Sequence, residues 1–316
     1  MIIPLFNVEN TLTETLGKIR CQRPGEVELV FVDDGSTDAT SSILKDYLKK
    51  TNFPCQFISQ SNQGAAAARN AAMNVSRGEY YVFLDGDDWW EEGAIDQILD
   101  LTDSKADIIG WDWTMVSKTR RRMRQADYST PEEALRNLMG GIMKWNLWLF
   151  AISRKLIEDN SLRFMHGADI GEDMRFILQA FSVAGTVSQV HDSLYCYNAS
   201  NPSSISLNIT EKKRMEVTEN MYDAVRFLGG TVYAGLASDL LPYLELYIKL
   251  PFLISLRKED YNVWLHWFPE SNAFAGKNRA LPFRTRMLQV MAAKKMWGAV
   301  HLYNILVYKI LDPIIH

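Results

Sequence analysis

Three short polar clusters interrupt the apolar first third of the sequence, and their side chains are suited to binding a metal ion and phosphate. The richest cluster is Asp85-Gly86-Asp87-Asp88, which follows the apolar residues 80–84. Closely spaced carboxylates are ligands of hard cations such as Mg²⁺ and Mn²⁺, which in turn bind phosphate oxygens. The other two clusters are Asp33-Asp34 and Phe6-Asn7. For each acidic cluster, a turn that only caps the next helix is the alternative.

The sequence lacks the common glycine loops that bind phosphate. It contains neither G-x-G-x-x-G nor G-x-x-x-x-G-K-[ST], whose backbone N–H groups would hold phosphate directly. An alternative way to hold a phosphate-bearing ligand is a divalent cation that bridges phosphate oxygens to one or two carboxylates. We expect Asp85 and Asp87 to bind that cation, Mn²⁺ or Mg²⁺.

The elements that must position these clusters alternate between strand-like and helical patterns, which predicts an α/β fold with a mostly parallel sheet flanked by helices. The expected strands cover residues 1–5, 27–32, 55–59, 80–84 and 107–111, and the expected helices cover 8–20, 36 or 37 to 50, 65–75 and 94–101. Ligands of open α/β sheets bind beyond the carboxyl ends of the strands. Parallel strands would bring all three clusters to one edge, and this predicts a nucleotide-sized ligand.

The alternation loosens after about residue 113. We expect helices at 154–159 and 172–184, strands at 186–190 and 193–197, and mostly helix from Thr210 onward. The basic run from Lys118 to Arg124 is expected to be a solvated loop, with a contact to a phosphorylated acceptor or an anionic lipid as the alternative. A boundary near residue 206 would separate a catalytic domain, 1–206 with halves 1–113 and 114–206, from a helical region, 207–316.

Composition excludes several classes of protein. The net charge of −4 over 316 residues argues against a nucleic-acid-binding protein. Three scattered cysteines predict neither a disulfide framework nor a zinc site, and they favour a reducing compartment. There is no secretory signal pattern and no apolar stretch of about 18 residues. We therefore expect a soluble, cytoplasmic protein.

Several motifs, taken in order, resemble those of family 2 glycosyltransferases. They are Ile2-Ile3-Pro4-Leu5-Phe6-Asn7, Val32-Asp33-Asp34-Gly35-Ser36, Asn62-Gln63-Gly64 with Ala68-Arg69-Asn70, and Leu84-Asp85-Gly86-Asp87-Asp88-Trp89. The match extends from Met1 to about Ser206. The resemblance implies a GT-A fold and an inverting hexosyltransferase that uses a nucleotide-diphosphate sugar, in the synthesis of cell-surface polysaccharide or glycolipid.

The resemblance also implies roles for individual residues. The residues that would contact the base, ribose or diphosphate of the donor are Pro4, Phe6, Asp34, Arg69 and Asp85. Asp87, together with Asp85, would bind the divalent cation. Asp173 of the pair Glu172-Asp173 has the position of the catalytic base, and its neighbour Glu172 is the nearest competitor. A Y-x-Y and S-x-S segment would line the acceptor or phosphate side, namely Tyr195, Tyr197, Ser204 and Ser206.

The identities of donor and acceptor are predicted more coarsely. Asp34 could accept the N3–H of uracil, which favours a UDP-sugar, although guanine carries a similar donor. The acceptor would be a saccharide or a lipid-linked saccharide. The wide apolar face of residues 296–315 predicts either packing within the protein or peripheral association with a membrane, aided by Lys294 and Lys295.

Two other functions are weighed against this one. A catalytically inactive sugar-nucleotide-binding subunit is disfavoured because Asp85, Asp87 and Asp173 are all present. A nucleotidyltransferase would carry a basic, glycine-rich loop after the first strand, and Phe6-Asn7-Val8-Glu9 is neither basic nor glycine-rich.

Overall fold

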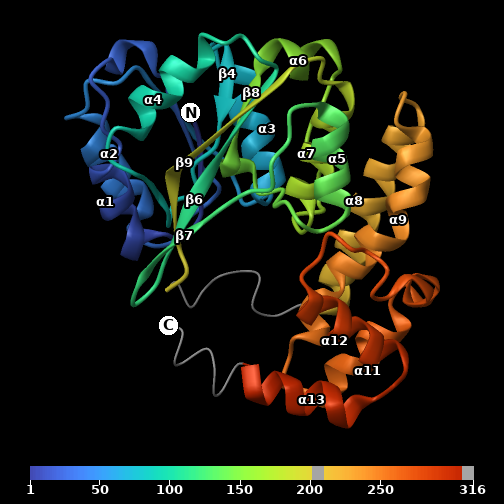
Figure 1. Cartoon of the computed structure of the whole chain (residues 1–316). Coiled ribbons are helices and arrows are strands. Elements are labelled where there is room, and N and C mark those ends of the chain that lie inside the picture. Colours follow the sequence, from blue (N-terminus) through green and yellow to red (C-terminus); the bar gives the residue numbers. More distant parts are fainter. Residues whose placement is uncertain (201–209, 308–316) are drawn as a thin grey trace.

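The N-terminal half is built around a parallel three-stranded sheet. The computed structural model describes residues 1–200 and 210–307 of the chain (Figure 1). Strands β1 (Ile2–Leu5), β2 (Leu29–Asp33) and β3 (Cys55–Ser59) pair in parallel in the order β1-β2-β3. All five residues of β2 are buried, as the continuous apolar run of a central parallel strand predicts. The predicted parallel arrangement is confirmed for this sheet.

A second, mixed sheet adjoins the first through a parallel bridge between Ile2 and Phe83. Its strand order is β4 (Tyr80–Val82), β8 (Phe150–Ser153), β6 (Ile108–Val116), β9 (Val187–Asn198) and β5 (Trp89–Trp90), with β7 (Arg120–Met123) paired to β6. Among the described strands of this second sheet, β6 and β9 pair in parallel and the other pairs are antiparallel.

Two predictions for this second sheet were wrong. The strands expected at 186–190 and 193–197 form one continuous strand, β9, which follows β6 through register shifts around Asp112. The basic run expected as a loop forms β7, antiparallel to β6. Pairing with a long partner strand overrides the weak intrinsic strand preference of three consecutive arginines, because β-propensity depends strongly on context.

Helices cover the sheets of the α/β part. They are α1 (Glu9–Gly17), α2 (Thr40–Leu48), α3 (Ala65–Val75), α4 (Ala94–Thr102), α5 (Pro131–Met139), α6 (Arg154–Asp159) and α7 (Glu172–Val183), with 3₁₀ turns η1 (Pro24–Glu26) and η2 (Leu147–Leu149). Neither Ser36 nor Thr37 caps α2, contrary to prediction. The helix begins at Thr40, whose N–H donates to Asp38 Oδ1 at 2.9 Å, while Ser36 Oγ accepts the N–H of Asn7.

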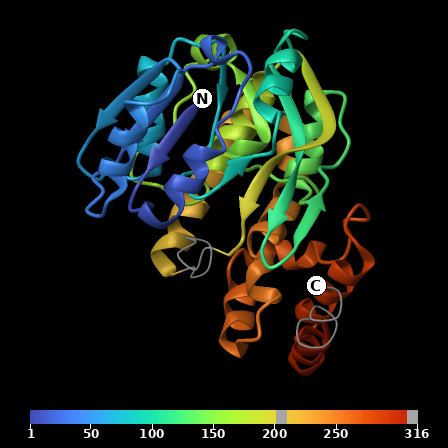
Figure 2. The same ribbon diagram turned by 90° about the vertical axis from the view of Figure 1, so that its left-hand side faces the viewer.

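The C-terminal region is helical, as predicted. Its described elements are α8 (Glu211–Gly229), α9 (Ala234–Ile248), α10 (Leu250–Leu253), α11 (Lys258–His266), η4 (Pro269–Phe274), α12 (Phe283–Ala293) and α13 (Trp297–Ile305). Helices α8 and α9 pack on α7 and α5 of the α/β part. Helices α10 to α13 form a layer of their own beyond it (Figure 2), around a second core that includes Phe252, Trp264 and Leu288.

Two further observations bear on the sequence predictions. In the part of the chain that the structure describes, no helix is long and apolar enough to cross a membrane. The predicted boundary at residue 206, together with Ser204 and Ser206, lies outside the described residues.

Candidate active site

The loops that follow β1, β2 and β4 are joined by hydrogen bonds at one edge of the molecule. The N–H of Asn7 donates to Ser36 Oγ at 3.1 Å, and the N–H of Thr37 donates to Asn7 Oδ1 at 2.9 Å. The buried hydroxyl of Thr15 on α1 donates to the carbonyl of Gly86 at 3.2 Å. The structure therefore brings the three polar clusters together at the carboxyl ends of their strands.

Gly86 packs closely against neighbouring side chains of the protein. A Cβ atom at this position would lie 2.8 Å from Leu5 Cδ2 and 3.1 Å from Val8 Cγ2. Its small size allows the Asp85–Asp88 loop to pack directly on the end of β1.

Asp34 organises the loop that leads into α3. Its Oδ1 accepts hydrogen bonds from Gln60 Nε2 at 2.7 Å and from the N–H of Gln63 at 2.9 Å, and its Oδ2 accepts the N–H of Gly64 at 2.8 Å. Only 4% of Asp34 is exposed. A carboxylate offers about four acceptor positions, so three internal donors leave it about one for a ligand.

Arg69 connects the two halves of the α/β part. It lies in the middle of α3 and is only 6% exposed. Its Nη1 lies 2.7 Å from Glu172 Oε1 and 3.4 Å from Asp173 Oδ1, and its Nη2 lies 3.5 Å from Asp85 Oδ1. One guanidinium thus holds three carboxylates, one from the loop after β4 and two from the first turn of α7.

The first turn of α7 presents Asp173 differently from Glu172. Gly171 precedes the helix in a left-handed conformation with φ of 83°. Asp173 Oδ2 accepts the N–H of Leu147 at 3.3 Å, and Oδ1 accepts no hydrogen bond from the described residues. The side chain of Asp173 is 18% exposed and that of Glu172 11%. The side chain of Asp173 is therefore the more exposed of the two, and its buried Oδ1 retains acceptor capacity.

Asp88 is buried behind the metal-binding candidates. Its Oδ2 accepts the hydroxyl of Tyr195 at 2.9 Å and its Oδ1 accepts the N–H of Asn198 at 2.7 Å. The same Tyr195 oxygen accepts the N–H of Asp85 at 3.3 Å. Tyr195 is fully buried, and its ring stacks on Trp148 at 4.4 Å between centroids. It supports the Asp85 loop from behind, and its predicted place in the lining of the acceptor or phosphate side stays a prediction.

Sequence reasoning missed Asp169. Its Oδ1 accepts the N–H of Ala66, in the first turn of α3, at 2.9 Å. Gly64 makes this approach possible, because its φ is 90° and a Cβ there would lie 2.0 Å from Asp169 Oδ2. Like Arg69, Asp169 joins α3 to the segment around the start of α7. No local sequence signal announces a contact across 103 residues.

The site has more negative charge than its own arginine can balance. Burial raises the pKa of Asp85 to about 6, with Arg69 lowering it and Asp87 raising it further. Burial also raises the pKa of Glu172 to about 8, helped by Asp173 and opposed by Arg69. The pKa of Asp88 is raised by burial and by its acidic neighbours. The electrostatic environment therefore favours an additional positive charge.

The residues present fit a divalent cation that is completed by a ligand. In the described part of the chain, no three His, Cys, Asp or Glu residues form a complete metal site. A cation of the Mg²⁺ type commonly takes one or two carboxylates and completes its shell with water and phosphate oxygens. Asp85 and Asp87 supply hard oxygen donors, and the negative charges of Asp87 and Asp173 add to burial in raising the pKa of Asp85.

The loop after β1 exposes an aromatic ring beside these carboxylates. Phe6 is 47% exposed, an unusual degree for a phenylalanine, while Pro4 is half-buried within β1. An exposed ring of this kind can stack on a nucleobase, since every base has a π-face. The predicted place of Phe6 beside the base is compatible with its exposure.

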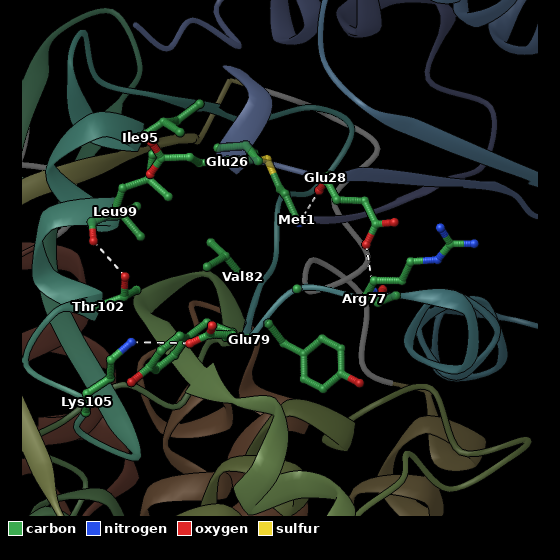
Figure 3. Close-up of a pocket in the computed structure, with 16 residues that line it drawn as sticks. Met1, Glu26, Glu28, Arg77, Glu79, Val82, Ile95, Leu99, Thr102 and Lys105 are labelled. Carbon is green, nitrogen blue, oxygen red and sulfur yellow. Dashed lines mark hydrogen bonds and ion pairs between the residues drawn. The ribbon is translucent and has the colours of Figure 1, made fainter. Parts of the chain in front are cut away.

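A cavity of about 440 Å³ lies away from these residues, at the amino ends of β1 and β4 (Figure 3). Its apolar floor includes Val82 and Leu99, and charged side chains surround the rim. Some of these rim residues contact one another. The Lys105 amine lies 3.3 Å from Glu79, and Glu28 accepts the N–H of Arg77 at 2.7 Å. None of the predicted site residues lines this cavity.

Comparisons with known proteins agree with this geometry. The curated protein "Uncharacterized glycosyltransferase EpsJ" of Bacillus subtilis (strain 168) is 29% identical over 95% of this chain and 85% of its own length. The crystal structure of Staphylococcus aureus TarS 1–349 in complex with UDP-GlcNAc is similar with a TM-score of 0.69, at 20% identity, over 98% of this chain and 90% of that one. The mannosyltransferase PcManGT of Pyrobaculum calidifontis, in complex with GDP-Man and Mn²⁺, gives a TM-score of 0.51 at 17% identity, over 94% and 86% of the two chains.

These structural likenesses confirm the predicted GT-A fold. The sequence profile of the family described as "Glycosyl transferase family 2" matches residues 1–168, which is more than half of the chain. With the strand-end carboxylates and Arg69 in place, the chain belongs to glycosyl transferase family 2.

Proposed function

We propose that this glycosyltransferase moves a sugar from a UDP-sugar to an acceptor hydroxyl with inversion of configuration, in a reaction that uses a divalent cation. The observation that carries the proposal is the buried Arg69, which holds Asp85 of the donor half within 3.5 Å and Asp173 of the acceptor half within 3.4 Å. This contact sets a candidate cation ligand beside a candidate base. The cation would act on the leaving-group side of the anomeric carbon, and the base would act on the acceptor side.

The donor side follows from the edge formed by the loops after β1, β2 and β4. The exposed ring of Phe6 would stack on the base, with Pro4 beside it. The remaining acceptor position of Asp34 would receive the N3–H of uracil. Support for uridine comes from the structurally similar TarS, whose crystal structure holds UDP-GlcNAc.

The chemical step assigns the base to Asp173. The acceptor oxygen attacks the anomeric carbon while the bond from that carbon to the diphosphate breaks, and Asp173 takes the hydroxyl proton. One displacement inverts the configuration without a covalent enzyme intermediate. Arg69 fixes the side-chain position of Asp173 during this transfer. When bound at Asp85 and Asp87, a divalent cation would stabilise the negative charge of the leaving diphosphate.

The acceptor side is proposed to receive a saccharide or lipid-linked saccharide of a cell-surface polymer, at the cytoplasmic face of a membrane. The hairpin of β6 and β7 supports an acceptor that carries phosphate. Arg120 of β7 pairs with Glu91, whereas Lys118 and Arg121 pair with no acidic residue among those described. The hairpin follows the end of β6 that pairs with Asn198, the residue whose N–H binds Asp88.

A donor panel tests this proposal. Thermal unfolding would be followed with UDP, GDP and their common sugars, each with and without Mn²⁺. We expect a rise in Tm with UDP compounds, larger with Mn²⁺, since a ligand at 100 times its Kd stabilises by about 2.7 kcal/mol. Tighter binding of GDP than of UDP would contradict the assignment of uridine. No response to any nucleotide would contradict the donor site itself.

A further inference from the structure

Helix α13 buries Val300 and Asn304 against the second core and exposes two leucines, Leu302 within the helix and Leu306 at its C-cap. Leu302 and Leu306, one helical turn apart, are 58% and 45% exposed. Asn304 is fully buried, and its amide donates to the backbone carbonyls of Leu253, at the end of α10, and of Ser255, both at 2.9 Å. The ring of His301 bonds the hydroxyl of Tyr261 at 3.2 Å. The two exposed leucines are unusual for a helix side that faces water, which normally carries polar or charged residues.

The segment around α13 carries positive charges and no negative ones. Residues 271–311 contain no Asp or Glu, and they contain seven Lys or Arg, of which the structure describes six. None of those six forms an ion pair with a described residue. Lys294 and Lys295 are both exposed and directly precede Met296, which is 49% exposed at the start of α13.

Acidic groups on the neighbouring helix do not neutralise this surface. Glu259 and Asp260 of α11 lie 3.1 and 3.8 Å from Arg257 of their own segment. Asp260 also accepts the hydroxyl of Ser255 at 2.5 Å. The cations before α13 therefore keep their full charge for an external partner.

We propose that Met296, Leu302 and Leu306, together with Lys294 and Lys295, form a surface that binds the headgroup region of an anionic lipid bilayer. Aliphatic side chains beside unpaired cations match acyl chains beneath phosphate headgroups. The helix is nine residues long, far shorter than the roughly 20 residues that span a bilayer. It therefore lies in the plane of the interface.

This inference rests on the proposed function, because it concerns how a lipid-linked acceptor would reach the enzyme. A lipid-linked acceptor would be presented at the same bilayer to which α13 binds. The binding itself involves none of the residues assigned to the donor, the cation or the base, so either proposal can fail without the other.

Vesicle sedimentation tests the inference on the full chain. Sucrose-loaded vesicles of phosphatidylcholine alone, and of phosphatidylcholine with about 30% phosphatidylglycerol, would be titrated at low and high salt. Each cation near such a surface contributes about fivefold to partitioning. We expect binding to the anionic vesicles only, lost at high salt, and at least tenfold weaker for Lys294→Glu with Lys295→Glu.

Matched variants separate this surface from general effects. Leu302→Glu with Leu306→Glu should reduce binding to anionic vesicles by at least tenfold, and the parental Tm and UDP affinity should be unchanged because both side chains are exposed. Lys49→Glu with Lys50→Glu, at the exposed end of α2, changes the same charge elsewhere and should bind vesicles like the parent.

Three results would overturn the proposal. Equal binding of the parent and both α13 variants would show that the surface is not used. Absence of binding by the parent to anionic vesicles at low salt would do the same. A parental dimer that Leu302→Glu with Leu306→Glu converts to monomer, without vesicle binding, would assign the face to a second copy of the chain.

Discussion

Replacing Arg69 with methionine should destabilise the protein strongly, because it leaves a buried acidic cluster without its cation. Methionine keeps much of the side-chain volume and removes the charge. Arg69 is 6% exposed and lies within 3.5 Å of Glu172, Asp173 and Asp85. Removal of one partner from a buried ion pair typically costs about 3–5 kcal/mol.

The expected shift in melting temperature follows from the size of the chain. The entropy of unfolding is about 0.7 kcal/mol per kelvin for 316 residues, so a loss of this size lowers Tm by about 4–8 °C. The matched control is Arg136→Met. Its ion pair with Glu132 at 2.7 Å is more than half exposed on both sides and contributes at most about 1 kcal/mol.

The destabilisation should also depend on pH. Arg69 lowers the pKa of both Asp85 and Glu172, which nevertheless reach about 6 and about 8 in the parent. When the pKa of a carboxyl group is higher in the folded protein than in the unfolded chain, the free energy of unfolding falls as the pH rises from the unfolded-state pKa to the folded-state pKa. Without Arg69 the folded-state pKa values of Asp85 and Glu172 rise further. The free energy of unfolding of the variant therefore keeps falling at pH values above the parental pKa values, where that of the parent no longer changes.

Thermal unfolding of parent and variant from pH 5 to pH 9 measures this directly. We expect the difference in Tm to be small at pH 5 and to widen above about pH 6. A variant that melts within about 1 °C of the parent throughout this range would refute the reasoning. A large difference that does not change with pH would show that Arg69 stabilises by packing and not by charge.

Two further predictions concern the loops around the same cluster. Chelation by EDTA should abolish transfer, and Asp87→Ala should abolish it with Tm within about 2 °C of the parent; full turnover in excess EDTA would exclude a required cation. Gly64→Ala should cost about 2 kcal/mol or more in urea unfolding, because its φ is 90° and a Cβ would lie 2.0 Å from Asp169. The control is Gly17→Ala at the last residue of α1, where a Cβ would meet nothing within 4 Å, and this change should be neutral or slightly stabilising. Equal losses of stability at both glycines would contradict the steric argument.

Elements with strong local signals could be predicted from the sequence. Helix α3 has the predicted bounds because its alanine-rich sequence has high helix propensity. Strand β3 also has the predicted bounds. Helix α5 was missed although its signal is local: Thr130 accepts the N–H of Glu133 at 3.2 Å, and Glu133 accepts the N–H of Ser129 at 2.8 Å. This serine/threonine and glutamate spacing resembles a capping box.

The site was predictable in part. The three polar clusters lie together as predicted from the rule that ligands bind at the carboxyl ends of parallel strands. The contacts of Arg69 with Glu172, and of Ala66 with Asp169, each join residues 103 positions apart. No periodicity or propensity encodes such pairs, because they depend on how α7 docks on α3. The individual roles of Asp34, Asp87 and Asp173 stay predictions.

The base assignment is the central claim, and a comparison of two isosteric variants tests it most directly. Asp173→Asn and Glu172→Gln each replace one carboxyl group of the Arg69 cluster with an amide and preserve side-chain shape. A positioned carboxylate base contributes about 10²–10⁴-fold to the rate. With the preferred donor and acceptor, Asp173→Asn should lose at least 100-fold in transfer rate while binding UDP and Mn²⁺ normally, and Glu172→Gln should keep more activity. Transfer by Asp173→Asn within a few-fold of the parent would show that another group is the base.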